Sequence, residues 1–452
     1  MEPDFVDSGD SGDSGDSGYD GLPRVGAVRL ATRAGQLGWL LTLAGGRLAG
    51  HAAASLARRD FRARRDRWFV DVVAGLGPAF IKAAQLLGTR ADLLPPGVCA
   101  ALSRLHDRVP ADPAPDPATL PAPDRLTLIP GPRGVPEAVA AGSIACVYRG
   151  VTETGAVVAV KIRRPGIAER LATDLRLLRL GARLVARVPP FRGMPVTEIV
   201  AQITTAIHRQ VDFRREARHL TAFADNLAEV ARLSIPAVHP ELSTDSVLVM
   251  DFAEDLRRVE PSELSAEARR EAVLATLRGV YHMLFLDGLV HCDLHPGNLY
   301  FRPDGSVVLV DAGFTVRLDQ VTREKFAAFF LHMSLGDGPG CAQIVLSTAT
   351  RGRCGDEEVF IAELGALVEA NSAVAAQEFD LVDFATKLFT IQRRHALYAD
   401  PQFIFPLLSL LVLEGTVRAF SPQVDFQKVA QPYLLDAMFA RVIEAHGVRV
   451  TA

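Results

Sequence analysis

The sequence predicts an α+β fold with two lobes, in which a small sheet is followed by a mostly helical body. Three observations support this prediction. Strand-like runs are confined to residues 143–162, 247–250 and 299–310, helical patterns precede the first of them, and only helical patterns follow residue 321. The 452 residues are 49% hydrophobic and 23% charged, which suits a large buried core and excludes a wholly disordered or collagen-like chain.

Overall charge and cysteine usage exclude further classes. Lys and Arg total 49 against 53 Asp and Glu, a net charge of -4, so no global basic field suggests a nucleic-acid partner. The five cysteines are scattered and include no Cys-x-x-Cys pair, which predicts reduced thiols in a cytoplasmic protein and argues against structural zinc.

The first 67 residues divide by charge. Residues 1–20 contain seven acids and no base and repeat Asp-Ser-Gly four times, which predicts a disordered acidic tail. Residues 21–67 contain ten arginines against two aspartates, together with Trp39 and several leucines. This Arg-rich segment predicts peripheral contact with an anionic membrane surface or, equally, a helix packed on its own domain. The apolar runs 35–50 and 403–413 fall short of the roughly 18–20 residues of a span, so we expect no transmembrane helix.

The remaining chain divides into four predicted parts. Residues 68–109 have helical spacing and form an N-terminal extension, and nine prolines in residues 110–136 mark a linker. Residues 137–253 form the first lobe and residues 254–452 a helical second lobe that carries the functional loops.

Within these parts we predict two hairpins and three long helices. The first hairpin pairs residues 143–149 with 157–162 around the turn 152–155, and the second pairs 299–301 with 307–310. The predicted helices are 174–185, 197–227 and 265–286, the last with Ser265 as N-cap and Gly288 at its end.

The most specific chemical signal is His291-Cys-Asp-Leu-His-Pro-Gly-Asn298, followed by the second hairpin and Asp311-Ala-Gly313. Phosphoryl transfer depends on positioning and on Mg²⁺, which prefers a few carboxylate and amide oxygens. An Asp five residues before an Asn can act on the acceptor while the Asn oxygen reaches a metal. A second Asp, delivered by the hairpin, meets the same metal. The spacing therefore predicts a protein kinase-like fold with Asp293 as the catalytic carboxylate and Asn298 and Asp311 as magnesium ligands.

Two other interpretations cover parts of this segment. His291, Asp293 and His295 alternate and could bind zinc from a strand, although Pro296 and Gly297 favour a loop. An ordinary Asp-rich turn would explain the segment alone, but not the partners found upstream.

The upstream partners are Lys161 and Glu216. Lys161 ends the run Val158-Ala-Val-Lys161, where kinase-like proteins hold the α- and β-phosphates, and Glu216 would orient it through an ion pair. The chain has only five lysines among 49 basic residues, so a lysine here argues for a compact ammonium group. Glu216 lies among charges, from Asp212 onward, that also fit a solvated helix face.

Together these motifs resemble the UbiB/AarF family of atypical kinases, also called the ADCK family, over roughly residues 68–420. Residues 77–95 resemble the family's Lys-x-Gly-Gln signature, and residues 140–144 resemble its alanine-rich phosphate loop. The other matching segments are 158–166, 212–217, 291–298, 311–313 and 413–415.

The resemblance implies a kinase-like fold whose N-terminal helices fold over the active site, with ATP and Mg²⁺ as cofactors. It also implies ATPase activity in support of isoprenoid-quinone or related lipid metabolism, with a membrane surface or a lipid- or quinone-modifying enzyme as partner. By the family pattern Lys82 and Gln85 reach into the nucleotide pocket near Asp212 and join Asp293, Lys161 and Glu216 as catalytic residues. The implied nucleotide-binding residues are Ala140, Ala141, Gly142, Ser143, Lys161, Met250 and Asp311.

Five positions depart from the family pattern: Ala84 replaces Gly, Gln210 replaces Glu, Gly142 replaces Ala, Ala312 replaces Phe and Leu294 replaces Pro. None of them removes a predicted metal or phosphate ligand, so we expect ATP binding to persist. Two alternative functions stay open. One is a small-molecule phosphotransferase, and the other is a non-catalytic nucleotide-binding regulatory module, which the departures favour.

Overall fold

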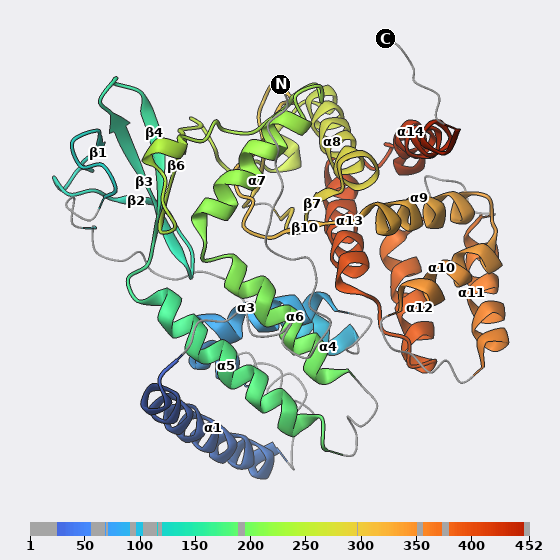
Figure 1. Ribbon diagram of the computed structural model, residues 1–452, viewed down its shortest axis with the longest axis horizontal. Coiled ribbons are helices and arrows are strands. Elements are labelled where there is room, and N and C mark those ends of the chain that lie inside the picture. Colours follow the sequence, from blue (N-terminus) through green and yellow to red (C-terminus); the bar gives the residue numbers. More distant parts are fainter. Residues whose placement is uncertain are drawn as a thin grey trace.

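The computed structural model describes residues 25–55, 68, 71–90, 96–102, 115, 120–188, 195–295, 297–349, 356–372 and 379–446. The predicted α+β fold with two lobes is confirmed. A sheet-bearing lobe and a helical lobe lie side by side, and a further layer of helices lies against them (Figure 1). The predicted acidic tail 1–20 lies outside the described residues.

The first lobe contains a five-stranded antiparallel sheet, in the order β1-β3-β4-β6 with β2 also paired to β3. Its strands are β1 (Leu126–Leu128), β2 (Ala138–Ala141), β3 (Ala145–Thr152), β4 (Val157–Arg163) and β6 (Val247–Asp251). β3 and β4 form the predicted hairpin, in which Lys161 pairs with Val147. β1 and β2 were not predicted, because the proline-rich and alanine-rich sequence there has little strand propensity. Both strands pair with β3 and not with β4, so they lie at one edge of the sheet. Prolines near an edge strand do not interrupt the hydrogen bonds between the central strands.

Five helices form the layer against the lobes: α1 (Ala27–Ser55), α3 (Pro78–Thr89), α4 (Pro96–Leu102), α5 (Ile167–Val185) and α6 (Val196–Arg209). α3 packs on α4, α5 and α6, and α1 lies along α5 (Figure 1). Arg33 of α1 donates to both carboxylate oxygens of the buried Asp174 of α5, at 2.6 and 3.0 Å. This bidentate ion pair holds α1 on the body of the protein.

The prediction of one continuous helix over 197–227 is wrong. α6 ends at Arg209, and a separate helix, α7 (Phe213–Asn226), begins after three intervening residues. Asp212 caps α7, because its carboxylate accepts hydrogen bonds from the backbone amides of Arg214 and Arg215 at 3.0 and 3.3 Å. The break turns α7 toward the space between the two lobes (Figure 1).

The second lobe opens with α8 (Ala266–Tyr281), which continues as a π-helical turn over His282–Asp287 and ends at Gly288. Ser265 caps α8 as predicted, and Gly288 has a φ of +72° that favours glycine. The loop region that follows contains β7 (Leu289–His291), β8 (Leu299–Phe301), β9 (Val307–Leu309) and β10 (Thr315–Arg317). β8 and β9 form the second predicted hairpin, and β7 pairs with β10.

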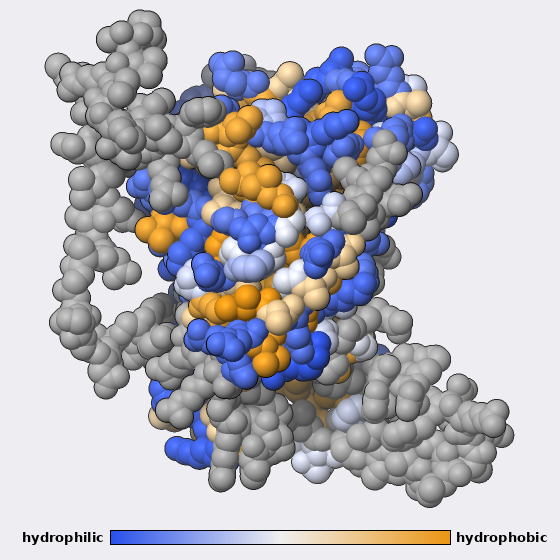
Figure 2. Space-filling view, turned by 90° about the vertical axis from the view of Figure 1, so that its right-hand side faces the viewer, coloured by the Kyte–Doolittle hydropathy of each residue, from blue (hydrophilic) through white to orange (hydrophobic). Residues whose placement is uncertain are grey.

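The described chain beyond β10 forms only helices, as predicted. They are α9 (Gln320–Ser334), α10 (Gly338–Thr348), α11 (Glu357–Ser372), α12 (Leu381–Arg394), α13 (Pro401–Phe420) and α14 (Phe426–His446). The remaining short elements are β5 (Leu233–Ser234), which pairs with β9, and two 3₁₀ turns at Pro240–Leu242 and Pro261–Glu263. The outer side of α10 and α11 shows apolar residues in small groups among polar ones (Figure 2).

α13 differs from its prediction. The apolar run 403–413 lies within a helix of 20 residues, which is long enough to span a membrane. The expectation that this segment is too short for a span is therefore wrong. In the described chain one helix, over Gln402–Phe420, is long and apolar enough to cross a membrane, but 61% of it is buried inside the protein. Glu414 on α13 is also buried, and its two carboxylate oxygens accept from the backbone amides of Leu381 and Val382 at the start of α12. Burial of this kind is typical of a helix in a protein core, so α13 is weak evidence for a span.

Candidate active site

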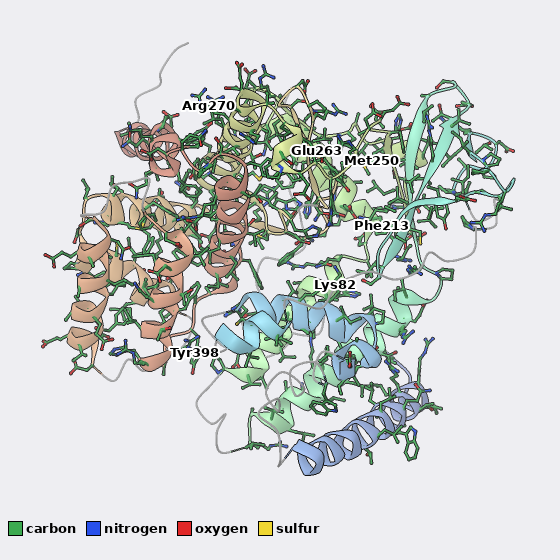
Figure 3. All side chains as sticks on the ribbon, turned by 180° about the vertical axis from the view of Figure 1, so that it is seen from behind. Lys82, Phe213, Met250, Glu263, Arg270 and Tyr398 are labelled. Atoms are coloured by element: carbon green, nitrogen blue, oxygen red, sulfur yellow. The ribbon has the colours of Figure 1, made fainter. Side chains whose placement is uncertain are left out.

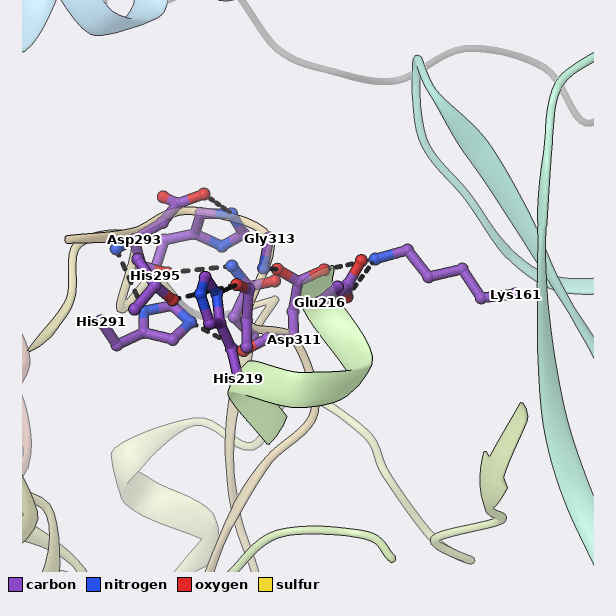
Figure 4. A network of polar contacts seen from close by, with 11 residues as sticks. Lys161, Glu216, His219, His291, Asp293, His295, Asp311 and Gly313 are labelled. Carbon is purple, nitrogen blue, oxygen red and sulfur yellow. Dashed lines mark hydrogen bonds and ion pairs between the residues drawn. The ribbon is translucent and has the colours of Figure 1, made fainter. Parts of the chain in front are cut away.

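Three charged side chains from distant parts of the chain meet between the lobes. The Lys161 ammonium lies 2.6 Å from Oε1 of Glu216 and 2.7 Å from Oδ2 of Asp311 (Figure 4). Lys161 comes from β4, Glu216 from the first turn of α7 and Asp311 from the loop after β9. The structure therefore brings together a lysine, a glutamate and an aspartate that the sequence predicted to share one site.

Local structure explains how each group reaches this point. The cap at Asp212 starts α7 one turn before Glu216, which directs Glu216 toward β4. The Phe213 ring lies 5.3 Å from the Lys161 ammonium and covers it on one side. Asp311 is held by its own loop, because the Gly313 amide donates to its Oδ1 at 2.8 Å and leaves Oδ2 for Lys161.

The group is electrostatically unbalanced. Burial lowers the pKa of Lys161, but the carboxylates of Asp311 and Glu216 outweigh it and raise this pKa above its usual value. Burial also raises the pKa of Asp311, but Lys161 outweighs it and holds the pKa well below its ordinary range. For Glu216, which is 3% exposed, burial dominates and raises the pKa to about 7. Two carboxylates thus share one ammonium, and once both are ionised the group has an excess negative charge.

The loop between β7 and β8 carries the second half of the site. The Asp293 amide donates to Nδ1 of His291 at 3.1 Å, so Nδ1 is an acceptor and the ring proton is on Nε2. Nε2 then donates to the backbone oxygen of Asp311 at 2.7 Å. Burial lowers the pKa of His291, which favours this neutral form. One imidazole thus ties the Asp293 loop to the Asp311 loop, a role that the sequence analysis did not assign to it.

Asn298 lies beside both aspartates. Its side-chain amide nitrogen donates to the backbone oxygen of Asp293 at 2.9 Å, so its amide oxygen is not used in that bond. The amide of Val310 donates to the backbone oxygen of Asn298 at 3.0 Å, which holds Asn298 and Asp311 next to each other across the hairpin. Amide and carboxylate oxygens are hard donors of the kind that Mg²⁺ prefers, and the excess negative charge of the site favours a cation. The residues therefore fit a magnesium ion.

The zinc interpretation of His291, Asp293 and His295 does not fit the geometry. Both ring nitrogens of His291 are occupied by the backbone of Asp293 and Asp311. Among the residues that the structure describes, no group of three or more His, Cys, Asp or Glu side chains is placed to hold a metal ion.

The predicted phosphate loop lies at the end of the sheet nearest Lys161. Ala140 and Ala141 belong to β2, and the loop proper is the turn 142–145, closed by a bond from the Gly142 amide to the Ala145 oxygen at 2.9 Å. Ala145 pairs with Arg163 and Val147 with Lys161, so the turn is about 7 Å along the sheet from Lys161. Ser143 is buried in this turn.

The other predicted residues lie outside the charged group. Lys82 and Gln85 are half-buried on α3, and Figure 3 shows Lys82 on the edge of α3 that faces the two lobes. Met250 is buried at the end of β6, opposite Ala159 of β4.

His219 of α7 is a further residue of the site that the sequence analysis missed. Its Nδ1 lies 3.4 Å from the backbone oxygen of Ala312, the residue between Asp311 and Gly313. Burial lowers the pKa of His219 to about 4. A histidine within one helical turn of a predicted catalytic glutamate is the only signal in the sequence that could have indicated it.

Comparisons with known proteins indicate the family of this chain. Residues 135–345 match the family model of the ABC1 atypical kinase-like domain. The chain is 30% identical over 381 residues to the probable protein kinase UbiB of Aeromonas salmonicida, covering 81% of this chain and 69% of the relative. It is 28% identical over 378 residues to the probable protein kinase UbiB of Tolumonas auensis, covering 80% and 68%. It is also 32% identical over 293 residues to the uncharacterized protein slr0889 of Synechocystis, covering 61% and 71%.

Proposed function

Because this chain belongs to the UbiB family of ABC1-type atypical kinase-like proteins, we propose that it is an ATP- and Mg²⁺-dependent atypical kinase or ATPase. The observation that carries the proposal is the meeting of Lys161, Glu216 and Asp311 between the lobes, at 2.6 and 2.7 Å. A buried lysine oriented by a glutamate, beside an aspartate with a strongly lowered pKa, is the arrangement that phosphoryl transfer from a nucleotide requires.

Each group has a distinct role in this proposal. Glu216 holds Lys161 in place, and Lys161 binds the α- and β-phosphates of ATP. Asp311 and Asn298 hold Mg²⁺, which neutralises charge on the phosphates. Asp293, whose side chain is 39% exposed, accepts a proton from the attacking hydroxyl or water. His291 keeps the Asp293 and Asp311 loops in register.

We expect the Asp293→Asn variant to lose ATP turnover by about 10²- to 10³-fold, because it removes the proton acceptor. ATP affinity should change little, since Asp293 lies outside the Lys161 group. The measurement is steady-state ATP hydrolysis together with the Kd of Mg-ATP. Asp319→Asn is the matched control, because Asn replaces Asp well at a helix N-cap and Asp319 caps α9. Unchanged turnover in Asp293→Asn would leave the non-catalytic nucleotide-binding module as the better interpretation.

We further infer that the protein acts at an anionic membrane surface, in isoprenoid-quinone or related lipid metabolism. α1 carries exposed Trp39 and Leu43 on the side away from the body, at 64% and 44% exposure. α5, which lies along α1, carries exposed Leu180 and Leu184 with Arg183 beside them, and exposed Arg187 and Val188 follow in the turn after this helix. Apolar side chains mixed with arginines on two adjacent helices suit binding to the interface of an anionic bilayer.

The double variant Trp39→Asp/Leu184→Asp should co-sediment with phosphatidylglycerol vesicles several-fold less than the wild-type protein at low salt. The physical reason is that each substitution places a charge where an apolar side chain would enter the interface. Val321→Asp on α9, where Val321 is 60% exposed, is the control and should bind as the wild type does. Equal vesicle binding by all three proteins would contradict the membrane proposal while leaving the ATPase proposal intact.

A further inference from the structure

The turn 142–145 has unused hydrogen-bonding groups. Within the described chain, the backbone amides of Ser143 and Ile144 donate to no other residue. The Ser143 hydroxyl is also without a partner, although Ser143 is only 2% exposed. A buried hydroxyl that bonds to nothing costs free energy unless a ligand or water completes it. Three donors at the end of the sheet nearest Lys161 therefore point to a ligand rich in acceptor oxygens.

Arg164 occupies the carbonyl side of the same turn. Arg164 follows directly after β4, and its backbone amide donates to the Ile144 oxygen at 2.8 Å. Its side-chain Nε donates to the Gly142 oxygen, also at 2.8 Å. One residue thus bonds to two carbonyl groups of the turn, once with its backbone and once with its side chain.

These bonds determine where the amide of Ser143 points. In a planar trans peptide the carbonyl of one residue and the amide of the next point in opposite directions. Because the Gly142 carbonyl points to the Arg164 guanidinium, the Ser143 amide must point away from it. The bond from Arg164 to the Gly142 carbonyl matters more because residue 142 is glycine, which gives the turn more backbone freedom than the alanine of the family pattern would. A Cβ at residue 142 would meet only the Ala145 oxygen, at 3.7 Å, so close packing does not otherwise restrain the turn.

We propose that Arg164 is a positioning residue, which holds the turn 142–145 so that the amide and hydroxyl of Ser143 bind the phosphate groups of the nucleotide. The proposal rests on the proposed ATP-binding function. Arg164 itself acts from behind the turn through the Gly142 carbonyl. Its loss should therefore weaken the binding of phosphates and leave the binding of the nucleoside part unchanged.

Arg163 provides a matched control. Its guanidinium donates to the backbone oxygens of Val211 and Asp245, at 2.7 and 2.9 Å, and forms an ion pair with the Asp245 carboxylate. None of these contacts is to the turn. Arg163→Gln removes a guanidinium group from the adjacent position but leaves the bond between Arg164 and the Gly142 carbonyl in place.

The test measures the Kd of Mg-ATP, Mg-ADP and adenosine for the wild type, Arg164→Gln, Arg164→Lys and Arg163→Gln in the full-length protein. We expect Arg164→Gln to weaken Mg-ATP and Mg-ADP by about tenfold or more and adenosine by less than about twofold. Arg164→Lys should recover part of the loss, because an ammonium group can still donate to the Gly142 oxygen. Arg163→Gln should affect the three ligands equally.

The outcomes separate this proposal from the function it rests on. A wild-type protein that binds no Mg-ATP would refute the proposed function and this inference with it. Wild-type binding with an unchanged Arg164→Gln Kd, or with an equal loss for ATP, ADP and adenosine, would overturn the role of Arg164 alone. If Arg164→Gln does not fold, the same comparison between Arg164→Lys and the wild type decides, because a selective loss of phosphate affinity is expected there too.

Discussion

The Asp311→Ala variant is expected to lose both ATP turnover and the Mg²⁺-dependent part of its stabilisation by ATP. Asp311 has a strongly lowered pKa and a side chain that is 27% exposed, so it is an ionised carboxylate that a metal can reach. Without it, Asn298 is the remaining side chain of the proposed metal site. A ligand at 100 times its Kd stabilises a protein by about 2.7 kcal/mol, which corresponds to a rise in Tm of about 3–5 °C here.

The variant should still fold, which makes the measurement interpretable. Removing Asp311 leaves Lys161 paired one-to-one with Glu216 at 2.6 Å, so no buried charge is stranded. The measurement is thermal unfolding with ATP plus Mg²⁺, ATP plus EDTA, and neither. Asp124→Ala, in an exposed turn before β1, is the control and should shift as the wild type does. An Asp311→Ala protein stabilised by Mg-ATP as much as the wild type would refute the metal role of Asp311.

The predictable part of the site consists of groups joined through short stretches of chain. Asp293 and Asn298 lie on one loop, and Asp311 comes directly after the hairpin that follows this loop. Their spacing along the sequence therefore already predicts that the three residues lie close together. The β8–β9 pairing, which the strand pattern predicted, and the β7–β10 pairing, which it did not, then set their register. Lys161 and Glu216 were predicted through their motifs, because no local pattern specifies a contact between residues 55 positions apart.

The parts that were missed depend on tertiary contacts between weakly patterned segments. The break between α6 and α7 comes from a single cap at Asp212, which an uninterrupted helical periodicity conceals. The bond between α1 and α5 joins Arg33 and Asp174 across 141 positions. The role of Arg164 depends on which carbonyl groups the turn 142–145 directs toward it, and this is a property of backbone geometry alone.

The second large effect is expected for Lys161→Met, which removes the ammonium that Glu216 and Asp311 share. Breaking a buried ion pair from one side costs about 3–5 kcal/mol of unfolding free energy, because the opposing charge stays buried. Here two carboxylates are left together, so we expect a loss in this range at pH 8. The measurement is urea-induced unfolding at pH 5, 6, 7 and 8. Lys387→Met is the control, since Lys387 is 57% exposed and pairs with Asp383 on the surface of α12.

The pH dependence of this loss has a definite sign. In the wild type the pKa of Asp311 is lowered, so its contribution to stability is present above its ordinary pKa and disappears only in strong acid. The pKa of Glu216 is raised to about 7, so the wild type loses some stability as the pH rises through 7, but Lys161 keeps this pKa lower than burial alone would set it. In Lys161→Met, burial and mutual repulsion raise the pKa of both carboxylates, and a raised carboxyl pKa means stability that is lost as the pH rises through it. The difference between wild type and variant must therefore grow from pH 5 to pH 8. A loss of stability that is the same at every pH would show that the two carboxylates are not coupled through Lys161.

Mg²⁺ alone gives this experiment a second readout. A divalent cation that binds Asp311 replaces the missing positive charge, so Mg²⁺ should restore part of the stability of Lys161→Met at pH 8. It should restore much less in the double variant Lys161→Met/Asp311→Ala, which retains Glu216 but lacks the metal-binding carboxylate. Recovery in the first protein and not in the second would mean that the carboxylates attract a cation in the absence of nucleotide. Equal recovery in both would place the bound Mg²⁺ elsewhere on the protein and remove the support for Asp311 as its ligand.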